Sequence, residues 1–403
     1  MENTARVNYL DWLRIFAIIG VLLFHSAMPF SKDYQWHISN PEGSDILTEF
    51  IFWLSRFRMP LLFFISGAVT WFMVKRRTTS GFILLRLRRL FIPLIVGILV
   101  VVPPQVYLER LSQGYKGSYW TFLLSVFSFK PYPEGNFSWH HLWFIVYLFI
   151  YDMLLAPFFK WCAGEQAVDF RQKLHFFATK KNVYLLIIPT SLLYGIMVSS
   201  YPQTNALIND PLFFIYWMGF VLVGFICMVQ PTIIQSLERN RHLSLGIAFL
   251  LLVIVNCIRW GSFEWSGHSS PARESWHTKL FSTSFPLMAW TWVFAIVGYG
   301  KRYLNITNRA MDYLNTSIYP FFILHQTVII LITYRVVQST DGIGLKYVFI
   351  VISTLFATIM TYHLFIRPFP IMRFLFGMKP LKKKSPIPHK KKAVMKGAEV
   401  SAF

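Results

Sequence analysis

The sequence predicts an all-α protein that crosses a membrane about ten times. Of its 403 residues, 55% are hydrophobic and only 14% are charged, whereas soluble domains have about 45–50% apolar and about 25% charged residues. Apolar segments of membrane-spanning length recur along the chain, and basic residues gather between alternate segments. This composition excludes a soluble enzyme, a disordered scaffold and a small secreted module.

Ten apolar segments are candidates for transmembrane helices, which need about 20 residues each. The third is interrupted by Pro93 and by the Pro103-Pro104 pair, and the fifth is short, so these two are the least regular. A proline within a membrane helix is tolerated where neighbouring groups satisfy the freed carbonyl. The predicted helices lie at residues 10–28, 47–74, 90–106, 142–159, 184–200, 213–229, 243–260, 281–299, 318–337 and 347–365.

The basic residues indicate the orientation of these helices. The formal net charge of +21 comes from 39 Lys and Arg against 18 Asp and Glu. When the connections are assigned to alternate sides, 27 basic residues fall on the side of the N-terminus, seven on the other side and five within the helices. Because cytoplasmic loops of membrane proteins are rich in Lys and Arg, both termini are predicted to be cytoplasmic. The positive charge therefore reflects topology, and no nucleic-acid partner is expected.

The chain divides into a membrane domain, residues 1–376, and a basic tail, residues 377–403. The tail is rich in Lys and Pro, so we expect it to be disordered and attracted to anionic lipid headgroups, at about 1 kcal/mol per basic residue. The three cysteines show no paired spacing and are expected to be core residues. Neither a Cys/His metal-ligand spacing nor a Gly-rich phosphate loop is recognisable, so no metal and no bound cofactor are predicted.

Three ionisable residues, Asp11, Arg14 and His25, share one face of the first predicted helix. At 100° per residue, His25 lies about 20° from Arg14 and about 40° from Asp11 around the helix axis, and about 16 Å along the axis from Arg14. Charged groups within a membrane helix usually face the bundle interior or an aqueous cavity and indicate function. This pattern predicts a transverse channel with a cation at its inner end and a titratable base at its outer end. The alternative is that Asp11 pairs with Arg14 while His25 only bonds a neighbouring helix.

Further candidates are basic or histidine residues near other predicted helices. In the second helix, Arg56 and Arg58 point to opposite sides, so at most one lines the same cavity. His141 opens the fourth helix and His325 lies within the ninth; each is either a site residue or a structural donor. Arginines suit a polyanionic ligand, because guanidinium groups match phosphate oxygens, although cytoplasmic loops are basic in any case. Three of them precede the third helix: Arg86, Arg88 and Arg89.

Six motifs in order make the chain resemble membrane acyltransferases of the acyltransferase-3 type, and within them the branch that acts in glucan biosynthesis. They extend from about residue 8 to residue 380, and are YLDWLRIFAIIGVLLFH, FRMPLLFFISG, LRRLFIP, HLWFIVYL, IYPFFILH and IRPFPIMRFLFGMKP. The resemblance implies about ten helices, a cytoplasmic acyl-CoA donor and an acceptor sugar on the far side of the membrane. For the branch it implies succinyl transfer onto periplasmic glucans.

The same resemblance implies roles for individual residues. It makes Arg14 and His25 essential, and places Arg86, Arg88 and Arg89 on the CoA side. No extracytoplasmic hydrolase-like domain is recognisable, so catalysis is expected within the membrane domain.

Together these observations predict a multi-pass inner-membrane O-acyltransferase in which His25 is the general base. We expect Arg14 to orient the donor, Asp11 to fix Arg14, and Arg58 to bind the succinyl carboxylate or the developing oxyanion. His141 and His325 are assigned to the substrate side. The expected partners are acyl-CoA (succinyl-CoA as co-substrate), a periplasmic glucan or polysaccharide, membrane lipids and the glucan-synthesis machinery. An acyl-histidine intermediate remains open, and the alternative function is a glucan exporter without acyl-transfer chemistry.

Overall fold

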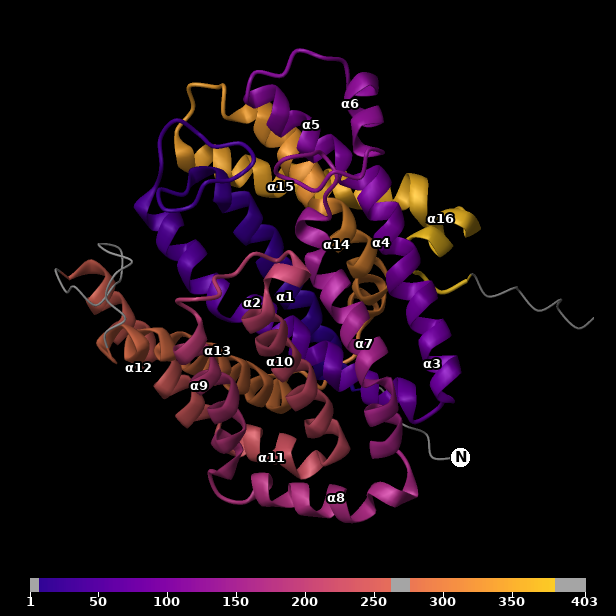
Figure 1. Cartoon of the computed structure of the whole chain (residues 1–403), viewed down its shortest axis with the longest axis vertical. Coiled ribbons are helices and arrows are strands. Elements are labelled where there is room, and N and C mark those ends of the chain that lie inside the picture. The colour runs from indigo at the N-terminus through magenta and orange to yellow at the C-terminus, as the bar shows by residue number, and fades with distance from the viewer. Residues whose placement is uncertain (1–6, 262–275, 381–403) are drawn as a thin grey trace, which may run out of the picture.

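The computed structural model describes residues 7–261 and 276–380, and within them the chain is helical with no β-sheet (Figure 1). The α-helices are α1 Asn8–Ala27, α2 Asp45–Val74, α3 Thr79–Arg86, α4 Ile92–Val96, α5 Pro103–Ser112, α6 Tyr119–Val126, α7 Trp143–Cys162, α8 Val168–Lys173, α9 Ile188–Met197, α10 Pro211–Val229, α11 Pro231–Arg239, α12 Arg241–Trp260, α13 Trp276–Tyr303, α14 Arg309–Val336, α15 Ile343–Thr361 and α16 Pro370–Leu375. Short 3-10 segments are η1 Met28–Phe30, η4 His140–Leu142, η5 Glu165–Ala167, η6 Leu174–Ala178, η7 Asn182–Ile187 and η8 Leu207–Asn209, and π-helical turns are η2 Leu87–Phe91, η3 Gly97–Val101 and η10 Tyr362–Ile366.

Nine helices among these residues are long and apolar enough to cross a membrane, which confirms the predicted all-α polytopic class. The predicted count of ten differs at the fifth segment, 184–200. That segment forms a shorter apolar helix, Asn182–Met197, in which six residues of η7 precede the ten of α9. Because a 3-10 turn rises about 2.0 Å per residue against 1.5 Å for an α-helix, these 16 residues still extend about 27 Å.

Residues near both ends of the described chain line one cavity. Arg14, in the second turn of α1, and Gly377, just after α16, both contribute to its wall. The predicted tail, residues 377–403, falls outside the described residues from position 381 onward.

Helices α2 and α10 form the tightest crossing of the bundle, because glycine removes the side chain at two contact points. A Cβ atom at Gly67 would lie 1.9 Å from the carbonyl oxygen of Val221, and one at Gly224 would lie 2.0 Å from that of Phe64. Small residues of this kind let the backbones of membrane helices approach closely. The crossing holds α2 against α10 in the centre of the bundle (Figure 1).

The third membrane-spanning helix is interrupted where the sequence places its prolines. It runs from Thr79 to Ser112 and contains the π turns η2 and η3. Pro93 lies in the first turn of α4 and Pro103 begins α5, so each follows a π turn. A π turn inserts one extra residue into a helix, and such turns recur at functional sites. Arg88 and Arg89 lie in a turn of this kind, Leu87–Phe91.

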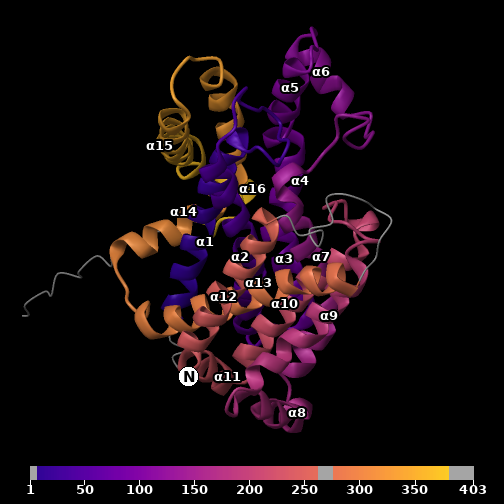
Figure 2. The same cartoon turned by 90° about the vertical axis from the view of Figure 1, so that its left-hand side faces the viewer.

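Two helices cover the outside of the bundle. Both α12 and α15 keep large apolar side chains exposed, as a lipid-facing helix does. Figure 2 shows α5 and α6 at one end of the long axis, and α8 and α11 at the other. Of the three cysteines, Cys162 and Cys227 are buried as predicted, whereas Cys257 is exposed on α12, which corrects its assignment to the core.

Candidate active site

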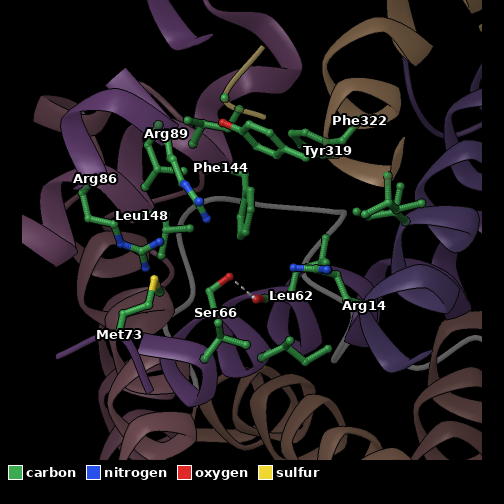
Figure 3. A pocket seen from close by; sticks show the side chains of 17 residues that line it. Arg14, Leu62, Ser66, Met73, Arg86, Arg89, Phe144, Leu148, Tyr319 and Phe322 are labelled. Atoms are coloured by element: carbon green, nitrogen blue, oxygen red, sulfur yellow. Dashed lines mark hydrogen bonds between the residues drawn. The ribbon is translucent and has the colours of Figure 1, made fainter. Parts of the chain in front are cut away.

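A cavity of about 220 Å³, here the arginine cavity, is lined by three of the predicted site residues, Arg14, Arg86 and Arg89 (Figure 3). They come from α1, α3 and η2, and apolar residues of α2, α7 and α14 complete the wall. The hydroxyl of Tyr319, which also lines the cavity, is buried without a hydrogen-bond partner among the described residues. The cavity therefore offers positive charge and an unsatisfied hydroxyl to a ligand.

The three arginines differ in how their charge is balanced. Arg86 is buried and forms an ion pair with Asp152, with 2.7 Å between Nε and Oδ2, and donates to Thr70 across 2.8 Å. Arg14 lies 3.5 Å from the carboxylate of Asp11. A buried charge is stable in apolar surroundings only when it is paired. The Arg86–Asp152 pair meets this condition, and it joins α3 to α7.

Arg89 and Arg88 have different surroundings. Arg89 lines the arginine cavity and has no ion-pair partner among the residues that the structure describes. Its neighbour Arg88 is exposed and does not line the cavity. Of the three predicted acyl-CoA residues, Arg89 alone combines a place in the cavity with a charge that no carboxylate of the described segments neutralises.

At the opposite end of the same α1 face, His25 contacts His325 of α14. The Nδ1 of His325 lies 2.6 Å from the carbonyl oxygen of Phe322, which only accepts, so this nitrogen carries a hydrogen. In the neutral ring Nε2 of His325 is then an acceptor, and the Nδ1 of His25 donates to it across 2.9 Å. This tautomer assignment, which follows from the hydrogen-bond network, leaves Nε2 of His25 unprotonated and free to accept a proton.

His141 joins the same group, which we call the histidine cluster (His25, His141 and His325). The rings of His141 and His325 meet edge to face with 5.2 Å between their centroids. His141 donates from Nε2 to the carbonyl of Ile323 across 2.9 Å, while its Nδ1 lies 3.4 Å from the amide nitrogen of Gln105. Its two nitrogens are thus engaged by neighbouring helices, and its assignment to the substrate side stays a prediction.

Arg58 approaches the histidine cluster from α2. Its guanidinium carbon lies 3.5 Å from the ring centroid of Phe24, the residue that precedes His25. Its Nε is buried with no hydrogen-bond partner among the described residues. Arg56 lies elsewhere, in a separate cavity of about 850 Å³ with Asp33, Asp45 and Glu49, so the two arginines diverge as their spacing predicts.

The sequence analysis missed a second polar group next to the histidine cluster. His37 lies 2.6 Å from the carboxylate of Glu109, which also accepts from the hydroxyl of Tyr132 at 2.5 Å. Burial and this carboxylate raise the pKa of Tyr132 to about 12, so its hydroxyl stays protonated and donates. Trp36 stacks on His25 with 6.4 Å between ring centroids. These residues lie in loops or at helix ends, where neither periodicity nor spacing in the sequence connects them.

The arrangement thus places a basic cavity and an unprotonated imidazole on one face of α1. A sequence model of the family described as "Acyltransferase domain", of the acyltransferase-3 type, matches residues 7–363. The chain belongs to the acyltransferase-3 family. The matched region contains both the arginines of the cavity and the histidine cluster, while Gly377 lies beyond it.

Relatives in this family are similar to the chain over almost all of its length. Glucans biosynthesis protein C of Escherichia coli O17:K52:H18 (strain UMN026 / ExPEC) is 23% identical over 395 residues, 94% of this chain and 96% of the relative. The protein of the same name from Salmonella schwarzengrund (strain CVM19633) is 22% identical over 389 residues, 93% of this chain and 95% of the relative. That of Escherichia coli (strain K12) is 22% identical over 395 residues, with 94% and 96% coverage. No solved structure matches significantly.

Proposed function

We propose that this acyltransferase moves an acyl group from acyl-CoA to a hydroxyl of an extracytoplasmic glucan, with His25 as the general base. The observation that carries the proposal is the hydrogen-bonded series from the Phe322 carbonyl through His325 to His25. This series fixes the tautomer of His25 and leaves Nε2 as the basic atom. A neutral imidazole suits general-base catalysis because its ordinary pKa is close to physiological pH.

In the proposed reaction, the acceptor hydroxyl attacks the thioester carbon while Nε2 of His25 takes its proton. The tetrahedral intermediate collapses with cleavage of the carbon–sulfur bond, and the departing CoA thiolate receives the proton back from His25. The products are an ester and CoA thiol. The proposed role of Arg58, whose Nε has no hydrogen-bond partner among the described residues, is to stabilise the negative charge that develops on the thioester oxygen.

The arginine cavity is the proposed donor site. Arg89 and Arg14 attract the phosphates of acyl-CoA, and the hydroxyl of Tyr319 offers a further hydrogen bond. Arg86 supports the wall through Asp152. Phe322 lines this cavity and also provides the carbonyl that begins the histidine series. Phe322 thus lies between the arginine cavity and the histidine cluster, and the proposed path of the pantetheine arm passes this residue.

The acceptor approaches His25 from the side of Trp36. This residue contributes to another cavity, of about 470 Å³, and stacks on His25. Aromatic rings of this kind suit the apolar faces of sugars. The name of the relatives, glucans biosynthesis protein C, favours a glucan acceptor, and the resemblance to that branch favours succinyl as the acyl group.

The proposed location is the inner membrane, with both ends of the chain in the cytoplasm. In this orientation the arginine cavity faces cytoplasmic acyl-CoA and Trp36 faces the periplasm. The clustering of 27 of the 39 basic residues on one side supports this choice. Membrane lipids and the glucan-synthesis machinery are the proposed partners.

Release of CoA thiol by the purified protein in nanodiscs tests the function. We expect thiol release from succinyl-CoA that requires glucan, with a matching mass increase on the sugar. His25→Ala should lower this rate by about 10²- to 10⁴-fold, the usual contribution of a general base. The exposed His175, which contacts Thr232 far from the histidine cluster in sequence, provides a matched control in His175→Ala.

Three results would contradict the proposal: unchanged transfer in His25→Ala, equal loss in His175→Ala, or glucan transport without any thiol release. Mass spectrometry of the protein after incubation with succinyl-CoA alone separates the two routes of transfer. A succinylated His25 would identify an acyl-histidine intermediate, whereas direct transfer leaves the protein unmodified.

A further inference from the structure

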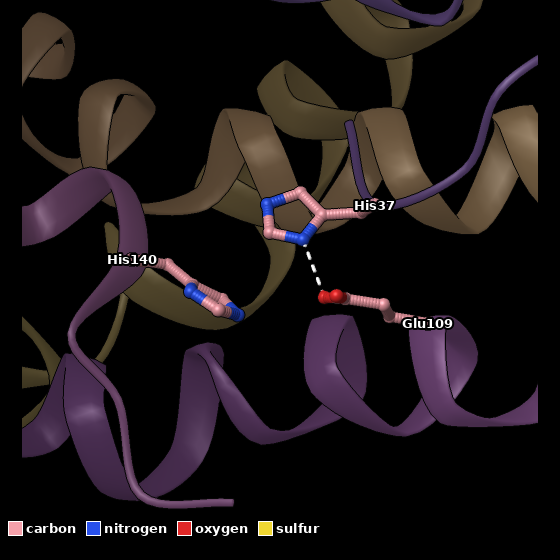
Figure 4. A group of neighbouring side chains, drawn as sticks. All are labelled: His37, Glu109 and His140. Carbon is pink, nitrogen blue, oxygen red and sulfur yellow. Dashed lines mark hydrogen bonds and ion pairs between the residues drawn. The ribbon is translucent and has the colours of Figure 1, made fainter. Parts of the chain in front are cut away.

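Three metal-ligating side chains from separate segments meet beside the histidine cluster. His37 lies in the loop between η1 and α2, Glu109 is in α5, and His140 begins η4. One ligand atom of each residue lies within 4.8 Å of the others, as the close view in Figure 4 illustrates. Glu109 is buried, so its carboxylate is largely withdrawn from solvent.

His140 provides the observation that points to a ligand. Its Nε2 is buried and makes no hydrogen bond within the described part of the chain. In Figure 4 the ring extends toward the pair formed by His37 and Glu109. The residue also adopts a positive φ of 37°, a conformation that residues other than glycine seldom occupy. An unsatisfied, basic nitrogen is therefore held next to a carboxylate and a second imidazole.

Each of the three side chains is supported by an outer hydrogen bond. The other nitrogen of His140 lies 3.0 Å from the hydroxyl of Ser138, and Nε2 of His37 lies 3.2 Å from the side-chain amide of Gln326. The second oxygen of Glu109 accepts from Tyr132. Metal-binding histidines and carboxylates are typically oriented by such partners.

We propose that His37, Glu109 and His140 bind one divalent transition-metal ion, with zinc as the best fit. Two imidazoles and one carboxylate are ligands that zinc favours, and three protein ligands leave a fourth position for water or a substrate hydroxyl. The ion replaces the proton shared by His37 and Glu109, and that proton is released to solvent. Two ligand atoms of a tetrahedral ion lie about 3.4 Å apart. The His37 and Glu109 atoms, now 2.6 Å apart, therefore separate by about 0.8 Å, and the gaps to His140, which are at most 4.8 Å, close by no more than about 1.4 Å.

The ion would join the loop of residues 31–44, α5 and the segment that leads into α7. Trp36, next to His37, stacks on His25, so the same ion would fix the aromatic wall beside the proposed base. The metal site depends on geometry alone and does not rest on the proposed acyl transfer. Its test therefore measures metal content and stability rather than activity.

The experiment uses the purified full-length protein in detergent, stripped with a chelator and then incubated with zinc sulfate. After desalting, elemental mass spectrometry should find one zinc per chain, and cobalt(II) should give the visible absorption of a low-symmetry site with nitrogen and oxygen ligands. Because an ion that binds only the folded state stabilises it, zinc should also raise the Tm.

Two variants and one control decide the outcome. His140→Asn retains a residue type that tolerates positive φ, and Glu109→Gln preserves the side-chain shape; each should reduce bound zinc at least tenfold and abolish the Tm shift. His175→Ala, which removes an exposed histidine, should change neither. The proposal is overturned if the stripped wild-type protein binds no zinc, or if both variants bind as much as the control, which would reveal adventitious binding only. Size-exclusion profiles establish that the variants are folded.

Discussion

The two ends of one face of α1 use different chemistry. Around Arg14 the groups are guanidinium ions, and carboxylates balance two of them, Asp11 beside Arg14 and Asp152 beside Arg86. Around His25 the groups are imidazoles, and backbone carbonyls orient two of them, Phe322 for His325 and Ile323 for His141.

Under the proposed function, this difference assigns recognition of the donor to the arginines and proton transfer to the histidines. Arginine stays charged at all physiological pH values, so it binds a polyanion but does not exchange protons. Histidine changes its charge near neutral pH, so it can move a proton once its tautomer is fixed. The comparison therefore predicts that changes at the arginine end alter donor binding, whereas changes at the histidine end alter turnover.

The substitution with the largest expected effect disrupts both the arginine cavity and the histidine cluster. Gly67→Ala places a methyl group 1.9 Å from the carbonyl oxygen of Val221, so α2 and α10 must separate and folding should fail or the Tm should fall sharply. Gly246→Ala in α12 is the matched control, because nothing lies within 4 Å of its added Cβ. Size-exclusion and thermal unfolding in detergent measure the effect. A Gly67→Ala protein as stable as the control would contradict this view of the crossing.

The next largest effect is a fall in kcat, without a change in the KM for acyl-CoA, when the histidine cluster is altered. His325→Gln removes the ring that fixes the tautomer of His25, so kcat should fall by roughly 10- to 100-fold, while the KM for acyl-CoA stays within about twofold. The pH profile should also shift, which a purely structural loss would not produce. Steady-state kinetics between pH 6 and pH 9 test this, and His242→Gln, which changes an exposed histidine of α12, is the control. A change confined to KM would remove His325 from the proton path.

The complementary change affects the arginine end. Arg89→Ala removes the cavity arginine that has no ion-pair partner among the described residues, so the KM for acyl-CoA should rise about tenfold with kcat nearly unchanged. Added salt should reduce the difference from wild type, because it screens the charge. Arg88→Ala, one residue away but exposed, should have a smaller effect. Equal effects of the two variants would show that general surface charge, rather than the cavity, attracts the donor.

The smallest effect concerns the outer support of Glu109. Tyr132→Phe removes one hydrogen bond to this carboxylate, and should cost about 1 kcal/mol of stability. The folded-state pKa of Tyr132 is raised from 10.0 to about 12, so the contribution is complete below pH 10 and disappears as the pH rises toward 12. Thermal unfolding at pH 8 and pH 11 measures this, and Tyr201→Phe, which changes an exposed tyrosine, is the control. If the difference in Tm between the wild-type protein and Tyr132→Phe is as large at pH 11 as at pH 8, this prediction is wrong.

The sequence predicted the fold well because hydropathy and charge depend on local segments. Apolar length identified the helices. Asn182–Met197 is shorter than the other spans, and its first six residues form a 3-10 helix. The helical spacing of Asp11, Arg14 and His25 also placed them on one face, because that spacing is fixed within a single helix.

Contacts between distant segments could not be predicted from the sequence. His25 and His325 are 300 positions apart, so nothing in either motif shows that their rings touch. Arg86 belongs to a basic motif that suggests phosphate binding, yet its charge is paired with the carboxylate of Asp152 in α7. The proposed metal ligands His37, Glu109 and His140 have no regular spacing, because three separate segments bring them together.

The shared position of Arg14 and Gly377 in the arginine cavity has a consequence for biosynthesis. Arg14 and Gly377 are 363 positions apart along the chain. The wall of the cavity is therefore complete only after the segment that follows α15 has been translated and has packed against α14, where Gly377 lies next to Tyr319. We expect a nascent chain that stops before this segment to have an open arginine cavity, although the three residues of the histidine cluster are already present. Under the proposed function, donor binding therefore follows the docking of this segment.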